Sequence, residues 1–555
     1  MVLLRTLCVF SFKSLIIRSE IGFKQENEGQ IVSLDYYNNQ TTSQLVQLLS
    51  NLNVSVNNNS FQSIKSTVTG GSLRYSSPVT SFELKNNNFV NSSSTSHGGS
   101  VYLTGLTNLF VKNCSFFTSY GASYAGAGYF TSTNANIEDI VVENSSSGTY
   151  GGAFYLSGTK HVLSNISITN SSSNSYGGAI YMSLNSFSLY NSRFSLCQTR
   201  SPNLYGGAIY STSCSVLFDI IGCLFIHIYG SSHGGAIYLV PSGHFPIYIK
   251  ESTFYNCTSN NGNGGAIYIY TSSGYNLEIE IMKICASQCK IATSSTALGH
   301  FLFIDSSIEA NSKTALSYIS MNYCGEITQG ISNIYLFESL LNLLNTNESF
   351  CQSFRSSALY LIPSRTLSCH FNTFFNNTSS DFDFIYIQGP ATVYSASIQN
   401  SNFIRNQCLA SIINITTYGS RLTIQECIFI NNTGSILFKS NIANILVKNC
   451  YIYHLTTVGV SVTFESTKTT TVNTQTYQLS HYSTVFCSTP EDMGQLELPC
   501  QTIPPPPTAV NDPQECITLP ATQTNCIIES GGNLTLLSHI LGILQSAILL
   551  ISISQ

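Results

Sequence analysis

Paired carboxylates are the residues of this 555-residue chain whose type and spacing would support catalysis. Glu278 and Glu280 lie two residues apart, as do Asp381 and Asp383, so each pair would share one face of a strand. Enzymes that cleave polysaccharides on a β-helix need such pairs, or carboxylates around calcium with a basic residue. Residues 144–250 contain a single acid. We therefore interpret the two pairs as solvated surface residues and predict no catalytic residue.

Other catalytic motifs are missing from the sequence. It has no Gly-x-Ser-x-Gly elbow, no phosphate-binding glycine loop and no His-Glu-x-x-His. Calcium-binding glycine repeats need Asp after their glycines, where this chain has Ala or Ser. Charged residues make up only 9% of the chain and the formal net charge is −5, which argues against binding driven by nucleic-acid phosphates. The sequence thus predicts no cofactor, no metal and no nucleic-acid partner.

The 18 cysteines form no Cys-x-x-Cys pair. Cys285 and Cys289 have neither a second pair nor a histidine at zinc-site spacing, so no zinc site is predicted. One group precedes similar apolar-aromatic blocks and is interpreted as small buried residues: Cys114, Cys223, Cys427 and Cys450. A second group would form a two-disulfide cap if the protein is exported: Cys487, Cys500, Cys516 and Cys526.

A repeat defines the elements that must position these residues. Blocks of Gly-Gly, a small residue, an apolar residue and an aromatic recur at intervals of 26–30 residues from residue 70 to 264, one of them in a degenerate form. The best-formed glycine pairs are Gly98-Gly99, Gly151-Gly152, Gly177-Gly178, Gly206-Gly207, Gly234-Gly235 and Gly264-Gly265. Glycine permits a positive φ where the chain turns sharply into a strand.

Units this short bury a core only by stacking, so residues 70–485 are predicted to form an all-β, right-handed, single-stranded parallel β-helix. An antiparallel sandwich or propeller is the alternative, but Asn-Gly hairpin turns are missing and the units are too short for four-stranded blades. In Ala236–Leu239 the alternation places Ile237 and Leu239 inward, and Ala236 and Tyr238 outward.

The tyrosines of the repeat are the candidate binding stripe. They follow the glycine pairs at a fixed offset, so stacked coils would align them as an outward ladder with steps of about 4.8 Å. Such a ladder is either stacked rings that stabilise the sheet or an uncharged contact surface for sugars or a partner protein. The stripe comprises Tyr102, Tyr155, Tyr181, Tyr210, Tyr238 and Tyr268.

A second block, Phe-x-x-Asn, persists where the glycines fade, at residues 374–377, 403–406 and 429–432. Together with the Gly-Gly-Ala-Ile blocks it resembles the paired repeats of the chlamydial polymorphic outer membrane proteins, over residues 70–450. That resemblance implies a parallel β-helix displayed at a cell surface with adhesin-like roles. Those proteins end in a membrane barrel, whereas the last hundred residues here lack alternating ten-residue strands. The chain is more similar to large trichomonad-type surface proteins with such repeats before a membrane anchor.

The ends differ from the repeat. Residues 1–29 carry a weak signal-peptide pattern and would form either a leader or a truncated start. We expect an irregular cap at residues 30–69 and a stalk with four consecutive prolines at residues 486–533. The last segment, 534–555, contains about 20 residues without a charge and would form a short apolar helix that spans a membrane. A glycolipid anchor and a buried helical cap remain alternatives for this segment.

Fifteen Asn-x-Ser/Thr triplets, among them those at Asn91, Asn113, Asn144, Asn165, Asn256, Asn376 and Asn414, are compatible with a glycoprotein. The sequence as a whole favours a cell-surface adhesin-like protein that contacts a host-cell or matrix protein or glycan. A structural coat protein without a ligand and a β-helix polysaccharide lyase or hydrolase are the alternatives.

Overall fold

The computed structural model describes residues 21–26, 31–36, 46–47, 53–76, 78–271, 275–306, 312–389, 395–416, 421–440, 443–453 and 457–470. The chain divides into two units, residues 1–493 and 494–555, and every described residue belongs to the first. The predicted stalk with its four cysteines and the predicted apolar helix lie outside the described residues.

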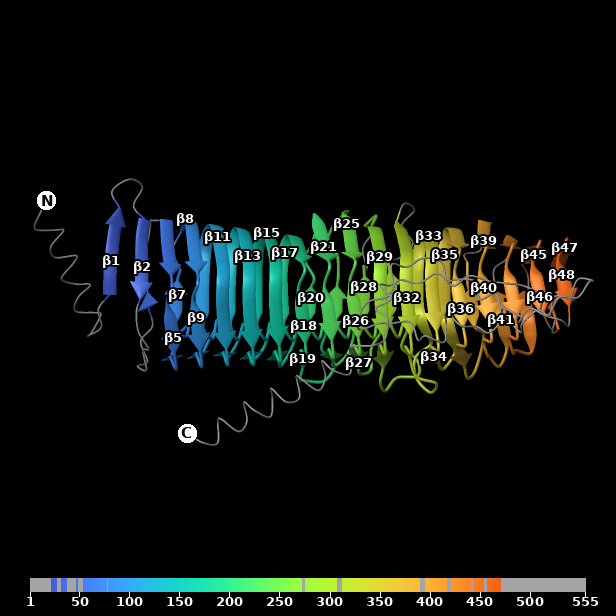
Figure 1. The fold of residues 1–555 in the computed structure, drawn as a ribbon, viewed down its shortest axis with the longest axis horizontal. Helices are drawn as coiled ribbons and strands as arrows, with labels where there is room; N and C mark the ends of the chain where they lie inside the picture. The colour runs from blue at the N-terminus through green and yellow to red at the C-terminus, as the bar shows by residue number, and fades with distance from the viewer. Residues whose placement is uncertain are drawn as a thin grey trace, which may run out of the picture. The chain divides into compact units, whose positions relative to one another are not determined.

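The described part of the chain is a parallel β-solenoid, which confirms the predicted fold class (Figure 1). Each coil adds a layer of strand to one large sheet and, through most of the stack, a two-residue strand to a small second sheet. All strand pairs are parallel except β1 (Ile21–Glu26) with β2 (Ile31–Tyr36), which is antiparallel. No helix occurs among the described residues.

The large sheet begins with β1 and β2, the second of which pairs in parallel with β4 (Asn53–Asn57). It then contains β3 (Val46–Gln47), β4, β5 (Ser60–Gln62), β7 (Leu73–Tyr75), β8 (Val79–Lys85), β9 (Asn88–Val90), β11 (Val101–Phe117), β13 (Gly128–Glu143), β15 (Phe154–Thr169), β17 (Ile180–Tyr190), β18 (Arg193–Ser195), β20 (Ile209–Ser211), β21 (Leu217–Ile221), β22 (Leu224–Ile226), β24 (Ile237–Leu239), β25 (Pro246–Lys250), β26 (Thr253–Tyr255) and β28 (Ile267–Tyr270). It continues with β29 (Glu278–Ser287), β31 (Leu302–Asp305), β32 (Lys313–Asn322), β33 (Ser332–Ser349), β35 (Ser356–His370), β36 (Thr373–Phe375), β38 (Ile385–Ile387), β39 (Ser395–Gln399), β40 (Asn402–Ile404), β41 (Ser411–Ile415), β42 (Arg421–Gln425), β43 (Ile428–Ile430), β44 (Ile436–Ser440), β45 (Asn444–Lys448), β46 (Tyr451–Tyr453), β47 (Val462–Glu465) and β48 (Lys468–Thr470).

The small sheet consists of two-residue strands: β6 (Lys65–Ser66), β10 (Ser93–Ser94), β12 (Tyr120–Gly121), β14 (Ser146–Ser147), β16 (Ser172–Ser173), β19 (Gln198–Thr199), β23 (Tyr229–Gly230), β27 (Thr258–Ser259) and β30 (Lys290–Ile291). Further along, β34 (Gln352–Ser353) pairs with β37 (Thr378–Ser379).

Two sharp corners, five residues apart, shape each coil. At each corner the backbone adopts a positive φ of about 50–60°, as at Asn165 (54°) and Asn170 (52°) in β15 and just after it. We call these the first and second corners. The glycine pair and the two corners divide the strand of each coil into three segments. The first segment follows the glycine pair, the second ends at the first corner, and the third lies between the corners. Asn tolerates this conformation better than most residues, which explains its abundance.

The same corner pair, Asn58 and Ser63, already exists in the coil formed by β4 and β5. Those strands pair in parallel with β8 and β9. Coil geometry is therefore already present at residues 53–63, within the segment 30–69 that the sequence assigns to the N-terminal cap. At the other end the stack persists beyond residue 300, as predicted, through β47 and β48.

The core is a set of apolar columns along the inside of the coils. Ile237 and Leu239 are fully buried, as the alternation predicts. Ala236 is also fully buried, so the prediction that it shares the outer face with Tyr238 is wrong. The alanine lies in the turn, where its carbonyl accepts hydrogen bonds from the N–H groups of Ala208 (3.0 Å) and Ile209 (2.9 Å) in the preceding coil.

The two glycines of each pair have different roles. The first has a positive φ, 64° at Gly151 and 65° at Gly234. The second lies against the next coil. A Cβ atom on Gly152 would stand 2.0 Å from the carbonyl oxygen of Gly178. The pair therefore combines a conformational requirement with a close backbone contact.

Replacing the second glycine should disrupt stacking. We expect Gly152→Ala to lower the free energy of unfolding by about 3 kcal/mol, because the neighbouring backbone cannot move away without breaking its own ladder. Denaturation followed by circular dichroism measures this change. The matched control is Gly243→Ala, whose Cβ would meet Ser215 at no less than 3.1 Å. Equal stability of the two variants would contradict the close-contact role.

Candidate functional site: a double aromatic ladder

The predicted tyrosine stripe is a continuous stack of rings, here called the inner column. It contains the six predicted residues and also Tyr129, from the degenerate repeat. Neighbouring ring centroids lie 4.5–5.1 Å apart, nearly parallel, from Tyr102 to Tyr268. Each tyrosine pairs in register with the next, as Tyr155 does with Tyr181. The stack continues through Phe303 at 4.8 Å.

A second stack, the outer column, was not predicted from the sequence. Its members directly precede the glycine pairs, or the degenerate copy of the pair, and neighbouring rings lie 4.5–5.5 Å apart. They also stack on the inner column of the next coil: Tyr176 lies 4.6 Å from Tyr210. The recurrence of Tyr or His immediately before the glycines was the available sequence signal. The outer column comprises His97, Tyr124, Tyr150, Tyr176, Tyr205 and His233.

The outer column packs on the inner column, which is buried at Tyr210 and Tyr268 and partly exposed at its other five members. Tyr210 is only 9% exposed and Tyr268 only 7%. Burial, followed by the proximity of other tyrosines, raises the pKa of Tyr181 to about 12. Burial also raises the pKa of Tyr176 in the outer column. Every member of the outer column is partly exposed, as are most members of the inner column, so both columns offer ring surface to solvent.

Hydroxyl groups border the ladder on both sides. Two residues beyond the inner column, the outward positions carry Thr131, Ser157 and Ser183, paired in register from coil to coil. Ser and Thr also directly precede the outer column at several coils, as at Ser123 and Thr149. The charged residues of positions 96–183 lie instead on the second and third segments or at a corner: Lys112, Glu138, Asp139, Glu143 and Lys160. Aromatic faces with neutral hydrogen-bonding groups suit an uncharged polyol or a polar protein surface.

The carboxylates Glu278 and Glu280 lie on one outer face, as their spacing predicts, at a shallow hollow of about 340 Å³. Glu278 forms an ion pair with Lys313 at 2.7 Å and Glu280 with Lys250 at 2.8 Å. Both pairs join adjacent coils, so these carboxylates contribute to the alignment of the coils.

The acids Asp381 and Asp383 differ in environment. Asp381 lies 3.9 Å from the guanidinium of Arg355. Asp383 is only 3% exposed and accepts hydrogen bonds from the backbone N–H of Ser411 (3.1 Å) and the side chain of Asn414 (2.8 Å). The interpretation of Asp383 as a solvated surface residue is therefore wrong, because its carboxylate binds the neighbouring coil.

The cysteines Cys114, Cys223, Cys427 and Cys450 are buried, as predicted, and each directly follows a first corner. In each, the Sγ–H donates to the carbonyl two residues before it, at 3.3–3.4 Å. Ser192 and Ser252 make the same bond at this position, at 2.7 Å. Burial raises the pKa of the Cys114 thiol to about 11. In these coils the position carries a small inward donor, whereas buried isoleucines occupy it in others, as at Ile140 and Ile166.

A second set of buried cysteines follows the second corner in the same way: Cys197, Cys257, Cys289, Cys324 and Cys351. Within the described residues, no group of three or more His, Cys, Asp or Glu side chains is arranged to hold a metal ion.

Comparisons of the chain with protein-family models, with curated proteins and with solved structures find no match. Among the helices and strands that the structure describes, no helix is long and apolar enough to cross a bilayer.

The buried phenols predict an alkaline transition. Free tyrosine ionises near pH 10, whereas Tyr181 in the folded chain has a pKa of about 12. A raised folded-state pKa gives stability that is complete below about pH 10 and is lost as the pH rises towards about 12. We expect ladder tyrosines to ionise in a separate high-pH phase, detected by phenolate absorbance. Tyr181→Phe should remove one phenolate from that phase. Ionisation of all tyrosines in a single phase near pH 10, with the circular dichroism of the solenoid unchanged, would contradict this assignment.

Proposed function

We propose that this chain is a cell-surface protein of the adhesin type and that the double aromatic ladder is its contact face. The observation that carries the proposal is an uncharged stack of thirteen rings in two columns, from His97 to Tyr268, bordered by hydroxyl groups. Tyrosine is favoured at interfaces because it offers a rigid apolar ring and a polar hydroxyl together.

Binding to the stack would cost little side-chain conformational entropy, because neighbouring rings already hold each ring in place. Its repeat of about 4.8 Å presents the same chemistry at every coil, which suits a repetitive ligand. A neutral host-cell or matrix glycan fits best, because ring faces and hydroxyls recognise sugars without charge. A host-cell or matrix protein is the second candidate.

A structural coat protein without a ligand is the alternative that the ladder itself favours, since stacked rings contribute roughly 0.5–1.5 kcal/mol per pair to stability. A polysaccharide-cleaving enzyme is less well supported. Its best carboxylates, Glu278 and Glu280, are engaged by Lys313 and Lys250. The proposal therefore assigns no catalytic residue and no cofactor.

Display outside the cell is part of the proposal. It rests on the resemblance of the repeats to those of surface proteins and on the apolar segment at residues 534–555 as anchor, either a membrane span or a glycolipid signal.

The contact role is tested on the outer column. We expect Tyr150→Ser, Tyr176→Ser and Tyr205→Ser together to weaken binding of purified solenoid to host cells or to a neutral glycan array at least about tenfold, equivalent to about 1.4 kcal/mol. Later coils stack without an outer column, so the fold should survive the loss of these rings.

The control is Tyr120→Ser with Tyr229→Ser, the same chemical change on the small sheet, where the tyrosines are 47% and 37% exposed. The control should bind like the unmodified chain. Unchanged binding by the triple variant, with its circular dichroism preserved, would leave the ladder with a structural role only.

The anchor is tested by deletion. Removing residues 534–555 should release the protein into the medium, as measured by fractionation of expressing cells. Replacing that segment with a known membrane span should restore retention. A truncated chain that stays with the membrane would refute the anchor assignment.

A further inference from the structure

The structure places the described Asn-x-Ser/Thr triplets in two environments, apart from the one at Asn53, which is exposed at the start of β4. Thirteen of the fifteen lie within described residues, and nine of those have their asparagine at a corner with positive φ. Seven of the corner asparagines are exposed and two, Asn256 and Asn376, are half-buried. The exposed ones are Asn58, Asn91, Asn113, Asn144, Asn165, Asn170 and Asn431.

At a corner, the asparagine and the hydroxyl residue of such a triplet face solvent, while the middle residue faces the core. In Asn165-Ile166-Ser167 the asparagine projects from the corner, Ile166 is 1% exposed and faces the core, and Ser167 returns to the outer side of the third segment. The side-chain amide and the hydroxyl thus lie on the solvent side, with the middle residue holding the corner in place.

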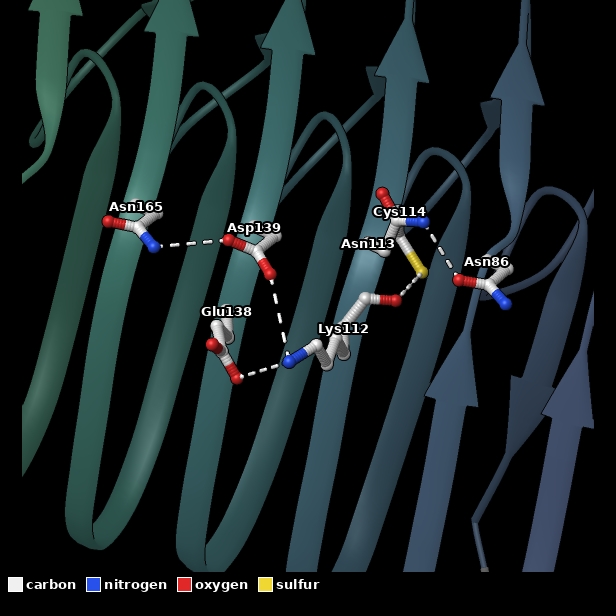
Figure 2. Close-up of polar contacts among 7 residues, drawn as sticks. All are labelled: Asn86, Lys112, Asn113, Cys114, Glu138, Asp139 and Asn165. Carbon is white, nitrogen blue, oxygen red and sulfur yellow. Dashed lines mark hydrogen bonds and ion pairs between the residues drawn. The ribbon is translucent and has the colours of Figure 1, made fainter.

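The amide nitrogen of a corner asparagine keeps a free hydrogen. Figure 2 shows Asn113 donating from Nδ2 to Asn86 Oδ1 at 2.8 Å, and Asn165 donating to Asp139 Oδ1 at 3.1 Å. An Asn Nδ2 carries two hydrogens, so substitution of one leaves the other for the bond between coils.

Three other triplets are unsuitable, because their asparagines are buried: Asn347, Asn377 and Asn414. Asn377 Nδ2 donates to the carbonyl of Glu348 at 2.9 Å and lies 3.1 Å from Asn406 Oδ1. To carry a glycan, each of these side chains would have to leave its buried site. The triplet at Asn414, one of those that the sequence makes compatible with a glycoprotein, is therefore not presented as an acceptor by the fold.

Exposed corner triplets also alternate between the two corners in the first coils. Asn58, Asn113 and Asn165 occupy first corners two coils apart, while Asn91 and Asn144 occupy second corners in the coils between. Directly stacked sites would be only about 4.8 Å apart. Within these coils only Asn144 and Asn170 stack directly.

We propose that the exposed corner asparagines are acceptors for N-linked glycans, which line the edges of the third segment and leave the aromatic ladder bare. From Ser96 to Tyr270 no triplet falls on the ladder positions. The inference rests on the proposed export of the chain. The co-reactant is a lipid-pyrophosphate oligosaccharide: a bond forms between Nδ2 and the sugar C1, the C1–O bond to pyrophosphate breaks, and the amide proton is lost as lipid pyrophosphate leaves.

The test uses the full chain with an added cleavable leader and a C-terminal acceptor tag, expressed in a eukaryotic secretory host. Glycopeptide mass spectrometry should find glycans on Asn113 and Asn165 and none on Asn377 or Asn414 of the folded protein. Ser167→Ala should remove one glycan, and Ser167→Thr should retain it, since both leave the corner asparagine unchanged.

A glycosylated tag with unmodified Asn113 and Asn165 would overturn the proposal, because the chain had then reached the transferase. Glycans on Asn377 or Asn414 in folded protein would overturn it equally. Failure of the chain without the added leader to leave the cytosol would instead defeat the proposed function and leave acceptance at the corners intact.

Discussion

At the glycine pairs, the backbone of one coil lies against a carbonyl oxygen of the next with no room for a side chain. A Cβ on Gly178 would stand 2.1 Å from the oxygen of Gly207, and one on Gly235 would stand 1.8 Å from that of Gly265. This contact permits one register between coils, since a slip by one residue would bring a side chain into the gap and turn every strand residue to the opposite face. In the coils that carry a glycine pair, the alignment of the other side chains depends on that register.

Fixed register converts a repeated sequence into columns of like side chains. The columns are chemically distinct: rings beside the glycines, asparagines at the corners, and small donors just inside them. Each column binds coil to coil through its own interaction. Ion pairs work in the same way, as Lys112 with Glu138 at 3.1 Å shows (Figure 2). A chain with only 9% charged residues can therefore hold a long stack by neutral contacts.

The period and the glycine pairs were enough to predict the solenoid and the inner column, because both follow from recurrence at a fixed offset. Three features needed the structure. The corners were hidden because their φ is shared by Asn165, Leu196 and Tyr323, residues with nothing common in the sequence. The donor position after the first corner could not be recognised in the sequence, because Cys occupies it in one coil and Ser in another, as at Cys223 and Ser252. The outer column was missed because its residues belong to the turn, where side-chain direction does not follow strand alternation.

The later coils stack in the same way as the earlier ones but lack the glycine pairs and the outer column. Beyond Gly265 the position of the outer column is taken by Leu298, which packs against Tyr268 and Phe303, and the second glycine is replaced by His300. Corners and stacked strands nevertheless continue to β48, with Phe374, Phe403 and Phe429 stacked in the core. Coils of this kind thus fold without an outer column, although the inner column continues through Tyr335, Tyr360 and Tyr386. Stacking of the later coils therefore does not require an outer column, so the column between His97 and His233 is free to serve the proposed contact role.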